Sequence, residues 1–335
     1  MKKRLVLLIG TFFLSVVLFA CNQSQVAQPI DAPTSLPTTT ESPLLTETPE
    51  PTETDLPEAT QTPAMVVQQD EEENPTNTSM PPTATPFDPA NWGQLPVIPT
   101  GVSERVKDIY QQGAAMGRSD SAFMKVGDCG SSTDWYLMDF DRGEAFYDLG
   151  EYDELEEVIV HFAGAFERRS VAAEDGFRAS SILSEFWADP DECQSGETPL
   201  SCEVRIMNPS IALITMGTND IHKVEAFEPG LRRILDELIE AGIVPVLATK
   251  ADNLEGDHSV NEIIVSVAME YELPVWNYWA ALQGLPNGGL QEDGAHLSFA
   301  TNYFNDPAVM ENGWPWRNLT ALQVLDAVWR GCTGD

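Results

Sequence analysis

The chain has 335 residues, with 53 acidic and 18 basic side chains and a formal net charge of −35 at pH 7. Residues 91–335 hold 15 basic and 41 acidic side chains, a net charge of −26, so they cannot assemble the basic patch that neutralisation of phosphates requires. This composition excludes a nucleic-acid-binding protein of that type, and it argues against docking of the folded part on anionic lipid.

The N-terminus has the pattern of an export signal. Residues 2–4 are Lys-Lys-Arg, and residues 5–19 form an apolar run that is too short for a membrane-spanning helix. The segment ends Leu-Phe-Ala-Cys at 18–21, which resembles the lipobox of bacterial lipoproteins. The resemblance implies that residues 1–21 are a lipoprotein signal peptide and that Cys21 carries the lipid. We therefore expect an exported protein anchored to the outer face of the cell membrane. The alternative is an ordinary secretory signal with an incidental cysteine.

Residues 22–90 have the composition of a tether. They hold 13 of the 24 prolines, and Phe87 is their only aromatic residue. Such a segment cannot bury enough apolar surface to offset its ordering entropy, so we expect a disordered Pro/Thr/Glu-rich linker. Residues 91–335 are long enough for one substantial core. We expect them to form one domain and the protein to be a monomer.

Within this domain, short apolar runs alternate with amphipathic stretches. Strands are predicted at 122–126, 170–173, 210–216, 243–248 and 274–277. Helices are predicted at 152–163, 178–187, 228–241, 259–271 and 317–330. Pro245 indicates that its strand begins nearby. The alternation predicts an α/β fold, a three-layer sandwich with a five-stranded parallel sheet flanked by helices.

Four short blocks of polar and glycine residues follow predicted strands or precede the last helix. They are Gly-Asp-Cys-Gly-Ser-Ser at 127–132, Glu-Asp-Gly at 174–176, Gly-Thr-Asn-Asp at 217–220 and Asp-Gly-Ala-His at 293–296. Ligands of parallel sheets bind beyond the carboxyl ends of the strands. Taken in this order, the four blocks resemble those of the SGNH (GDSL-type) hydrolase superfamily, over essentially all of residues 120–330.

The resemblance implies a role for one or two residues in each block. The third residue of the first block, Cys129, stands at the position of the family's serine nucleophile. Gly176 and Asn219 stand where the family stabilises the oxyanion, through a backbone N–H and a side-chain amide. His296 would be the base, and Asp293 would orient it. Acyl transfer needs such preorganised donors and a histidine held in one tautomer.

Cysteine at position 129 is a departure from the family, and three interpretations stay open. Cys129 is a thiol nucleophile activated by His296 and by the following helix N-terminus. Alternatively, it is locked in a disulfide or inactive, which leaves a binding protein for a surface glycan or a partner. In the third interpretation, Ser131 or Ser132 is the nucleophile.

The topology bears on which cysteines can pair. Cys129 should lie at the carboxyl end of the first strand, whereas Cys193, Cys202 and Cys332 should lie at the opposite end of the sheet. Strands of five residues separate those ends by roughly 17 Å, and a disulfide needs Cα atoms within about 7 Å. We therefore expect a free Cys129 and one disulfide among the other three.

The sequence predicts no cofactor. The polar loop at 252–258 lacks the ligand spacing of a calcium or zinc site, so we assign it no metal. The family contains lipid esterases, thioesterases, carbohydrate O-acetyl esterases and acetyltransferases. We expect an ester hydrolase, of the esterase or carbohydrate O-deacetylase type, that works through an acyl-enzyme on a small-molecule or glycan ester.

Overall fold

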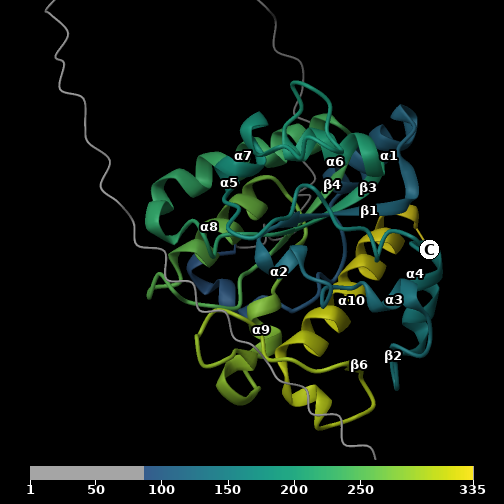
Figure 1. The fold of residues 1–335 in the computed structure, drawn as a ribbon, viewed down its shortest axis with the longest axis vertical. Coiled ribbons are helices and arrows are strands. Elements are labelled where there is room, and N and C mark those ends of the chain that lie inside the picture. Colours follow the sequence, from purple (N-terminus) through teal and green to yellow (C-terminus); the bar gives the residue numbers. More distant parts are fainter. Residues whose placement is uncertain (1–86, 335) are drawn as a thin grey trace, which may run out of the picture. The chain divides into compact units, whose positions relative to one another are not determined.

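The computed structural model describes residues 87–334, which contain a parallel sheet and a set of helices (Figure 1). The strands are β1 (Ser119–Gly127), β2 (Tyr147–Asp148), β3 (Pro209–Thr215), β4 (Val244–Ala248), β5 (Val275–Trp276) and β6 (Asn302–Tyr303). The longer helices are α1 (Glu104–Met116), α6 (Pro199–Met207), α7 (Val224–Glu240), α8 (Ser259–Glu270) and α10 (Gly313–Thr333). The shorter ones are α2 (Cys129–Ser132), α3 (Asp139–Arg142), α4 (Glu156–His161), α5 (Ala179–Ile182) and α9 (Tyr278–Leu282).

The main sheet has the strand order β1-β3-β4-β5, and all of its pairs are parallel. All five residues of β4 are buried, and so are the first six of β3, as expected for strands that are covered on both faces. β4 begins at Val244, one residue before Pro245, which confirms the predicted start of this strand.

Helices cover both faces of the sheet, so the fold is the predicted three-layer α/β sandwich. Each of the steps from β3 to β4 and from β4 to β5 moves one strand along the sheet in the same direction, with α7 and α8 as the crossovers. Right-handed crossovers of this kind place both helices on one face. α1 and α10 pack together on the other face (Figure 1).

Two local predictions were wrong, and other elements were missed. The described residues place four strands in the sheet instead of five, because the segment 170–173 makes only one isolated parallel bridge, from Ala173 to Gly127. Ala173 N donates to Ser170 O, which closes a turn and uses backbone groups that a longer ladder would need. The helix predicted at 178–187 is divided into α5 and a 3₁₀ turn, Glu185–Trp187. Of the longer helices, α1 and α6 were not predicted.

The first described element is a 3₁₀ helix, Pro89–Gln94, whose Trp92 is buried. The Asn277 side chain donates hydrogen bonds to Trp92 O and Leu95 O, which ties this segment to the end of β5. The signal peptide, Cys21 and residues 22–86 of the linker lie outside the described residues. Among the helices of residues 87–334, none is both long and apolar enough to cross a membrane.

Candidate active site

Cys129 begins α2 directly after β1, at the carboxyl end of the sheet. Asp128 caps this short helix, because its Oδ1 accepts a hydrogen bond of 3.1 Å from Gly130 N. Gly127 is needed at the last position of β1, since a Cβ there would lie 2.5 Å from the carbonyl oxygen of Thr215. The tight exit from the strand therefore depends on these two residues, and it presents the Cys129 side chain above the sheet.

His296 and Asp293 come from the loop that precedes α10. Asp293 Oδ1 accepts hydrogen bonds of 3.0 Å from the backbone N–H groups of Ala295 and His296, so the carboxylate also fixes the turn. Its other oxygen lies 2.6 Å from His296 Nδ1. The hydrogen bond from the His296 side chain is the main reason that the pKa of Asp293 falls to about 2. With Nδ1–H given to Asp293, the second ring nitrogen, Nε2, carries the lone pair.

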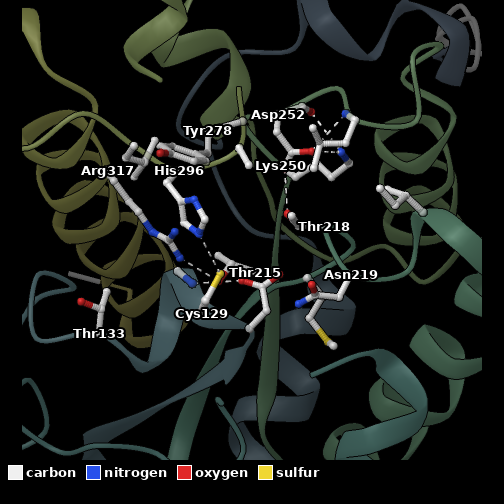
Figure 2. Close-up of a pocket in the computed structure, with 18 of the residues that line it drawn as sticks. Cys129, Thr133, Thr215, Thr218, Asn219, Lys250, Asp252, Tyr278, His296 and Arg317 are labelled. Atoms are coloured by element: carbon white, nitrogen blue, oxygen red, sulfur yellow. Dashed lines mark hydrogen bonds and ion pairs between the residues drawn. The ribbon is translucent and has the colours of Figure 1, made fainter. Parts of the chain in front are cut away.

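Cys129 and His296 face each other across the end of the sheet. The distance between Cys129 Sγ and His296 Nε2 is 3.8 Å, and Figure 2 shows the ring directed at the sulfur. The structure therefore brings Cys129, His296 and Asp293 into one line, in the order thiol, imidazole, carboxylate.

Asn219 lines the same cavity from the loop after β3. One N–H of its amide donates to Phe177 O at 3.1 Å, which holds this loop against the 174–178 loop. Asp220 makes a second link, because its Oδ1 accepts from Ala179 N at 3.3 Å. Burial raises the pKa of Asp220 to about 6.

Gly176 has a left-handed backbone, with φ of +80°, and nothing lies within 4 Å of the position that a Cβ would take. The positive φ of this turn explains why residue 176 is a glycine. Gly176 is exposed and is not among the residues that line the cavity, whereas Arg178 of the same loop is. Its role as an oxyanion donor stays a prediction.

The cavity has a volume of about 630 Å³, within the range of small-molecule sites. Cys129, His296 and Asn219 line it, together with five charged residues that have no assigned role in the sequence: Asp128, Arg178, Lys250, Asp252 and Arg317. Arg317 is the only charged residue in the stretch 313–325, and this was the only sequence signal for it. Asp128 belongs to the first block, whereas no motif connects the other four residues to the four blocks.

The surroundings of Cys129 do not favour its thiolate form. Burial raises its pKa to about 11, and the charges of Asp128 and Asp175 act in the same direction. Arg317 and the backbone N–H of Gly130 oppose this increase but do not reverse it. α2 is only four residues long, so its N-terminus offers little stabilisation of a thiolate. Cys129 is therefore a neutral thiol at neutral pH.

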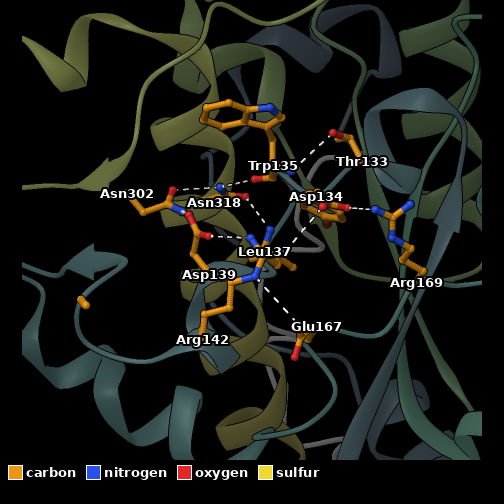
Figure 3. Close-up of polar contacts among 12 residues, drawn as sticks. Thr133, Asp134, Trp135, Leu137, Asp139, Arg142, Glu167, Arg169, Asn302 and Asn318 are labelled. Carbon is orange, nitrogen blue, oxygen red and sulfur yellow. Dashed lines mark hydrogen bonds and ion pairs between the residues drawn. The ribbon is translucent and has the colours of Figure 1, made fainter. Parts of the chain in front are cut away.

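The segment after α2 is held against α10 by Asn318 (Figure 3). Asn318 Oδ1 accepts from Leu137 N at 3.1 Å, and its amide donates to Trp135 O and to Asn302 Oδ1. Leu137 is fully buried with a φ of +68°, a conformation that costs a leucine about 1–3 kcal/mol. α10 thus determines the path of the chain beyond the nucleophile.

The cysteine pairing agrees with the topological prediction. Cys193 and Cys202 form a disulfide with a Cα–Cα distance of 5.3 Å, and Cys129 and Cys332 are free. In residues 87–334 the one grouping with metal-ligand geometry is Cys193, Glu197 and Cys202. Its two sulfurs are joined in the disulfide and offer no thiolate.

No protein-family model matches the chain, and no curated protein matches it. Among solved structures, it is similar to a GDSL-like lipase from Bacteroides thetaiotaomicron, with 13% identity and a TM-score of 0.39 over 66% of this chain and 97% of that one. It is also similar to a catalytic mutant of an acetylxylan esterase from Geobacillus stearothermophilus, with 15% identity and a TM-score of 0.36 over 62% of this chain and 95% of that one. These values are too low to carry an argument about function, which rests instead on the geometry of the site.

Proposed function

We propose that the protein is an ester hydrolase that works through an acyl-enzyme on Cys129. The observation that carries this proposal is the line from Asp293 through His296 to Cys129, with hydrogen-bond distances of 2.6 Å and 3.8 Å. A thiol, a base and a group that orients the base are the parts that nucleophilic acyl transfer needs.

The chemistry balances with these groups alone. Cys129 Sγ attacks the carbonyl carbon of the ester while His296 Nε2 takes the thiol proton. The C–O bond to the alcohol then breaks, and the imidazolium returns the proton to the leaving oxygen. Water attacks the resulting thioester with His296 as base, the C–S bond breaks, and the carboxylic acid leaves. Asp293 keeps the imidazole in the required tautomer and stabilises its charged form.

Oxyanion stabilisation is assigned to the Asn219 amide and the Gly176 N–H. Support comes from Asn219, which lines the cavity and uses one of its two amide N–H groups on Phe177 O, leaving the other to donate. A donor aimed at the developing oxyanion is worth about 10²–10³ in kcat.

An aromatic pair at the cavity favours a glycan ester as substrate. Trp135 and Phe299 are 40% and 52% exposed, their ring centroids lie 4.9 Å apart, and Phe299 borders the cavity. Exposed rings at a cavity border suit stacking on sugar rings, because such rings have an apolar face.

The second candidate is a catalytically inactive protein that binds a surface glycan or a partner. The observation in its favour is the pKa of Cys129, which at about 11 leaves little thiolate at neutral pH.

Hydrolysis of 4-nitrophenyl acetate distinguishes the two candidates. We expect turnover by the full chain, loss with Cys129→Ala and with His296→Ala, and a fall in kcat of about 10²–10³ with Asn219→Ala. Cys129→Ser should keep ester turnover, because a neutral hydroxyl makes the same demand on His296. Cys332→Ala, which removes the other free cysteine of residues 87–334 and lies outside the cavity, is the matched control and should have wild-type activity.

Inactivity of both the wild type and Cys129→Ser would favour the binding protein. Activity that survives Cys129→Ala and disappears with Ser131→Ala or Ser132→Ala would move the nucleophile to that serine. Ser131 is buried and Ser132 Oγ donates to Asp175 Oδ1 at 2.9 Å, so neither points to His296 as Cys129 does.

We also propose that the enzyme acts outside the cytoplasm, anchored through a lipid on Cys21. The disulfide between Cys193 and Cys202 supports export, because such bonds persist in oxidising compartments. Replacement of Cys21 should transfer the protein from the membrane fraction to the medium. Unchanged membrane association would contradict the lipid anchor.

A further inference from the structure

One buried cation in the cavity has no acidic partner. Arg317 is only 6% exposed and lines the cavity from α10, and Figure 2 shows its guanidinium beside Cys129 and His296. Its Nη2 donates to the hydroxyl oxygens of Ser131 at 3.2 Å and Thr215 at 2.8 Å, both uncharged. Among the described residues no carboxylate pairs with it, and its buried Nε has no hydrogen-bond partner.

These contacts do not satisfy all the hydrogen-bond donors of the Arg317 guanidinium. A buried guanidinium has five N–H donors and costs several kcal/mol unless its charge is compensated. Two hydroxyl groups satisfy Nη2 only. The rings of Tyr136, Trp314 and Tyr278, with centroids 4.3, 5.4 and 5.6 Å from the guanidinium carbon, hold the charge in place. They accept no hydrogen bond from the unused donors.

The unused donors lie beside the nucleophile. A Cβ on Gly130, the residue after Cys129, would lie 2.5 Å from Arg317 Nη1, so the guanidinium occupies space that only a glycine leaves open. Asp128 is a buried carboxyl on this strand end, and the charge of Arg317 lowers its pKa, but it caps Gly130 N and forms no ion pair with Arg317.

Lys250, the second buried cation of the cavity, has acidic partners. Lys250 Nζ lies 2.5 Å from carboxylate oxygens of both Asp252 and Glu255, so its charge is more than matched by protein groups. Arg178, the other arginine at the cavity, lies on its partly exposed loop. Arg317 is therefore the cavity's buried cation that forms no ion pair and still has unused donors.

We infer that Arg317 binds a carboxylate, and that the substrates of this site are esters carrying a carboxylate group. The statement about substrates rests on the proposed hydrolase function. The binding of a carboxylate by Arg317 does not depend on that function. A carboxylate matches the planar fork of a guanidinium, and hydrogen bonds between charged partners are about twice as strong as neutral ones. It would use Nη1 and supply the missing negative charge.

Matched ester pairs test the inference on the full chain. With the carboxylate on the acyl side, monomethyl succinate is compared with methyl pentanoate. With the carboxylate on the alcohol side, O-acetylglycolate is compared with propyl acetate. Acid release in a pH-stat gives kcat/KM for each. We expect the charged ester to be preferred about 10- to 100-fold in at least one pair, which also shows on which side the carboxylate lies.

Three variants test which residue causes the preference for charged esters. Arg317→Gln should abolish it. Gly130→Ala should weaken it without removing any charge, because the new methyl group displaces Nη1, and this variant decides the question if Arg317→Gln does not fold. Arg178→Gln, which removes the other cavity arginine, should keep the preference within about twofold. An unchanged preference in Arg317→Gln, or its loss in Arg178→Gln, would overturn the assignment. An equal fall for charged and neutral esters in Arg317→Gln would do the same.

Measurements of carboxylate binding distinguish a missing carboxylate site from a missing hydrolase activity. Isothermal titration calorimetry should detect succinate with the wild type, about tenfold or more weaker binding with Arg317→Gln, and no binding of uncharged succinamide. Hydrolysis of neutral esters without any preference for charged ones overturns the carboxylate site and leaves the hydrolase intact. Arg317-dependent binding of succinate without hydrolysis of any ester supports the carboxylate site and contradicts the hydrolase.

Discussion

Thiol–disulfide exchange at Cys129 should be slow at neutral pH and should accelerate about tenfold per pH unit. The pKa of this thiol is raised from an ordinary value of 9.0 to about 11, mainly by burial. Two units correspond to about 100-fold less thiolate at pH 7. A more basic thiolate is also a better nucleophile, with a Brønsted coefficient of about 0.4–0.5. Over two pKa units this raises the rate constant of each thiolate nearly tenfold, which offsets part of the loss in thiolate concentration. The net expectation is a rate roughly tenfold below that of an ordinary thiol.

The assay is the release of thiopyridone from the uncharged reagent 4,4′-dithiodipyridine, followed from about pH 6 to pH 10 across the expected thiolate range. The double variant Cys21→Ala/Cys332→Ala isolates the Cys129 signal, and the same chain unfolded in urea provides the reference rate. Cys21→Ala/Cys129→Ala supplies the control in which Cys332 alone reacts, and burial raises the pKa of Cys332 to about 12. A rate that is independent of pH and at least equal to that of the unfolded chain would refute the reasoning. It would mean that a thiolate–imidazolium pair already exists at rest.

Two further predictions concern stability. Burial raises the pKa of Asp128 from 3.8 to about 6, so the folded state holds this proton more tightly, and the stabilisation present below about pH 4 is lost as the pH rises through 6. Asp128→Asn should therefore raise the free energy of unfolding in urea by up to about 3 kcal/mol at pH 7 and not at pH 4, and an equal gain at both would contradict this. Asn318→Leu leaves Leu137 N and Trp135 O without partners and should lower that free energy by about 2–5 kcal/mol, whereas a loss under about 1 kcal/mol would contradict the role of Asn318.

The parts of the fold that the sequence predicted are those with local signals. β3 and β4 are continuous apolar runs, and their burial on both faces follows from that pattern. Parallel pairing then brings the carboxyl ends of the strands to one edge, which is why Cys129 and Asn219 line one cavity. The segment 170–173 failed because four apolar residues are compatible with a turn as well as with a strand.

The parts of the site that the sequence did not predict depend on distant contacts. Arg317 contacts Ser131 across 186 positions, and nothing near either residue encodes that contact. The raised pKa of Cys129 has the same origin, because desolvation depends on how loops from several strands close over the thiol. A short helix after a strand looks favourable to a thiolate in the sequence, and only the packed structure shows that burial has the larger effect.

In the proposed mechanism, the high pKa of Cys129 affects how the thiol would hydrolyse an ester. The tetrahedral intermediate expels either the alkoxide, which completes acylation, or the Cys129 thiolate, which returns the substrate. A thiol of lower pKa leaves faster, so an acidic thiol would favour return. At a pKa of about 11, Cys129 is a poorer leaving group than an ordinary thiol, which shifts the partition towards acylation. His296 can protonate the alkoxide, because its Nε2 has just received the thiol proton and its Nδ1 stays on Asp293. Burial thus reduces the concentration of thiolate and raises the fraction of tetrahedral intermediates that proceed to the acyl-enzyme. The same environment suits a hydroxyl nucleophile at this position.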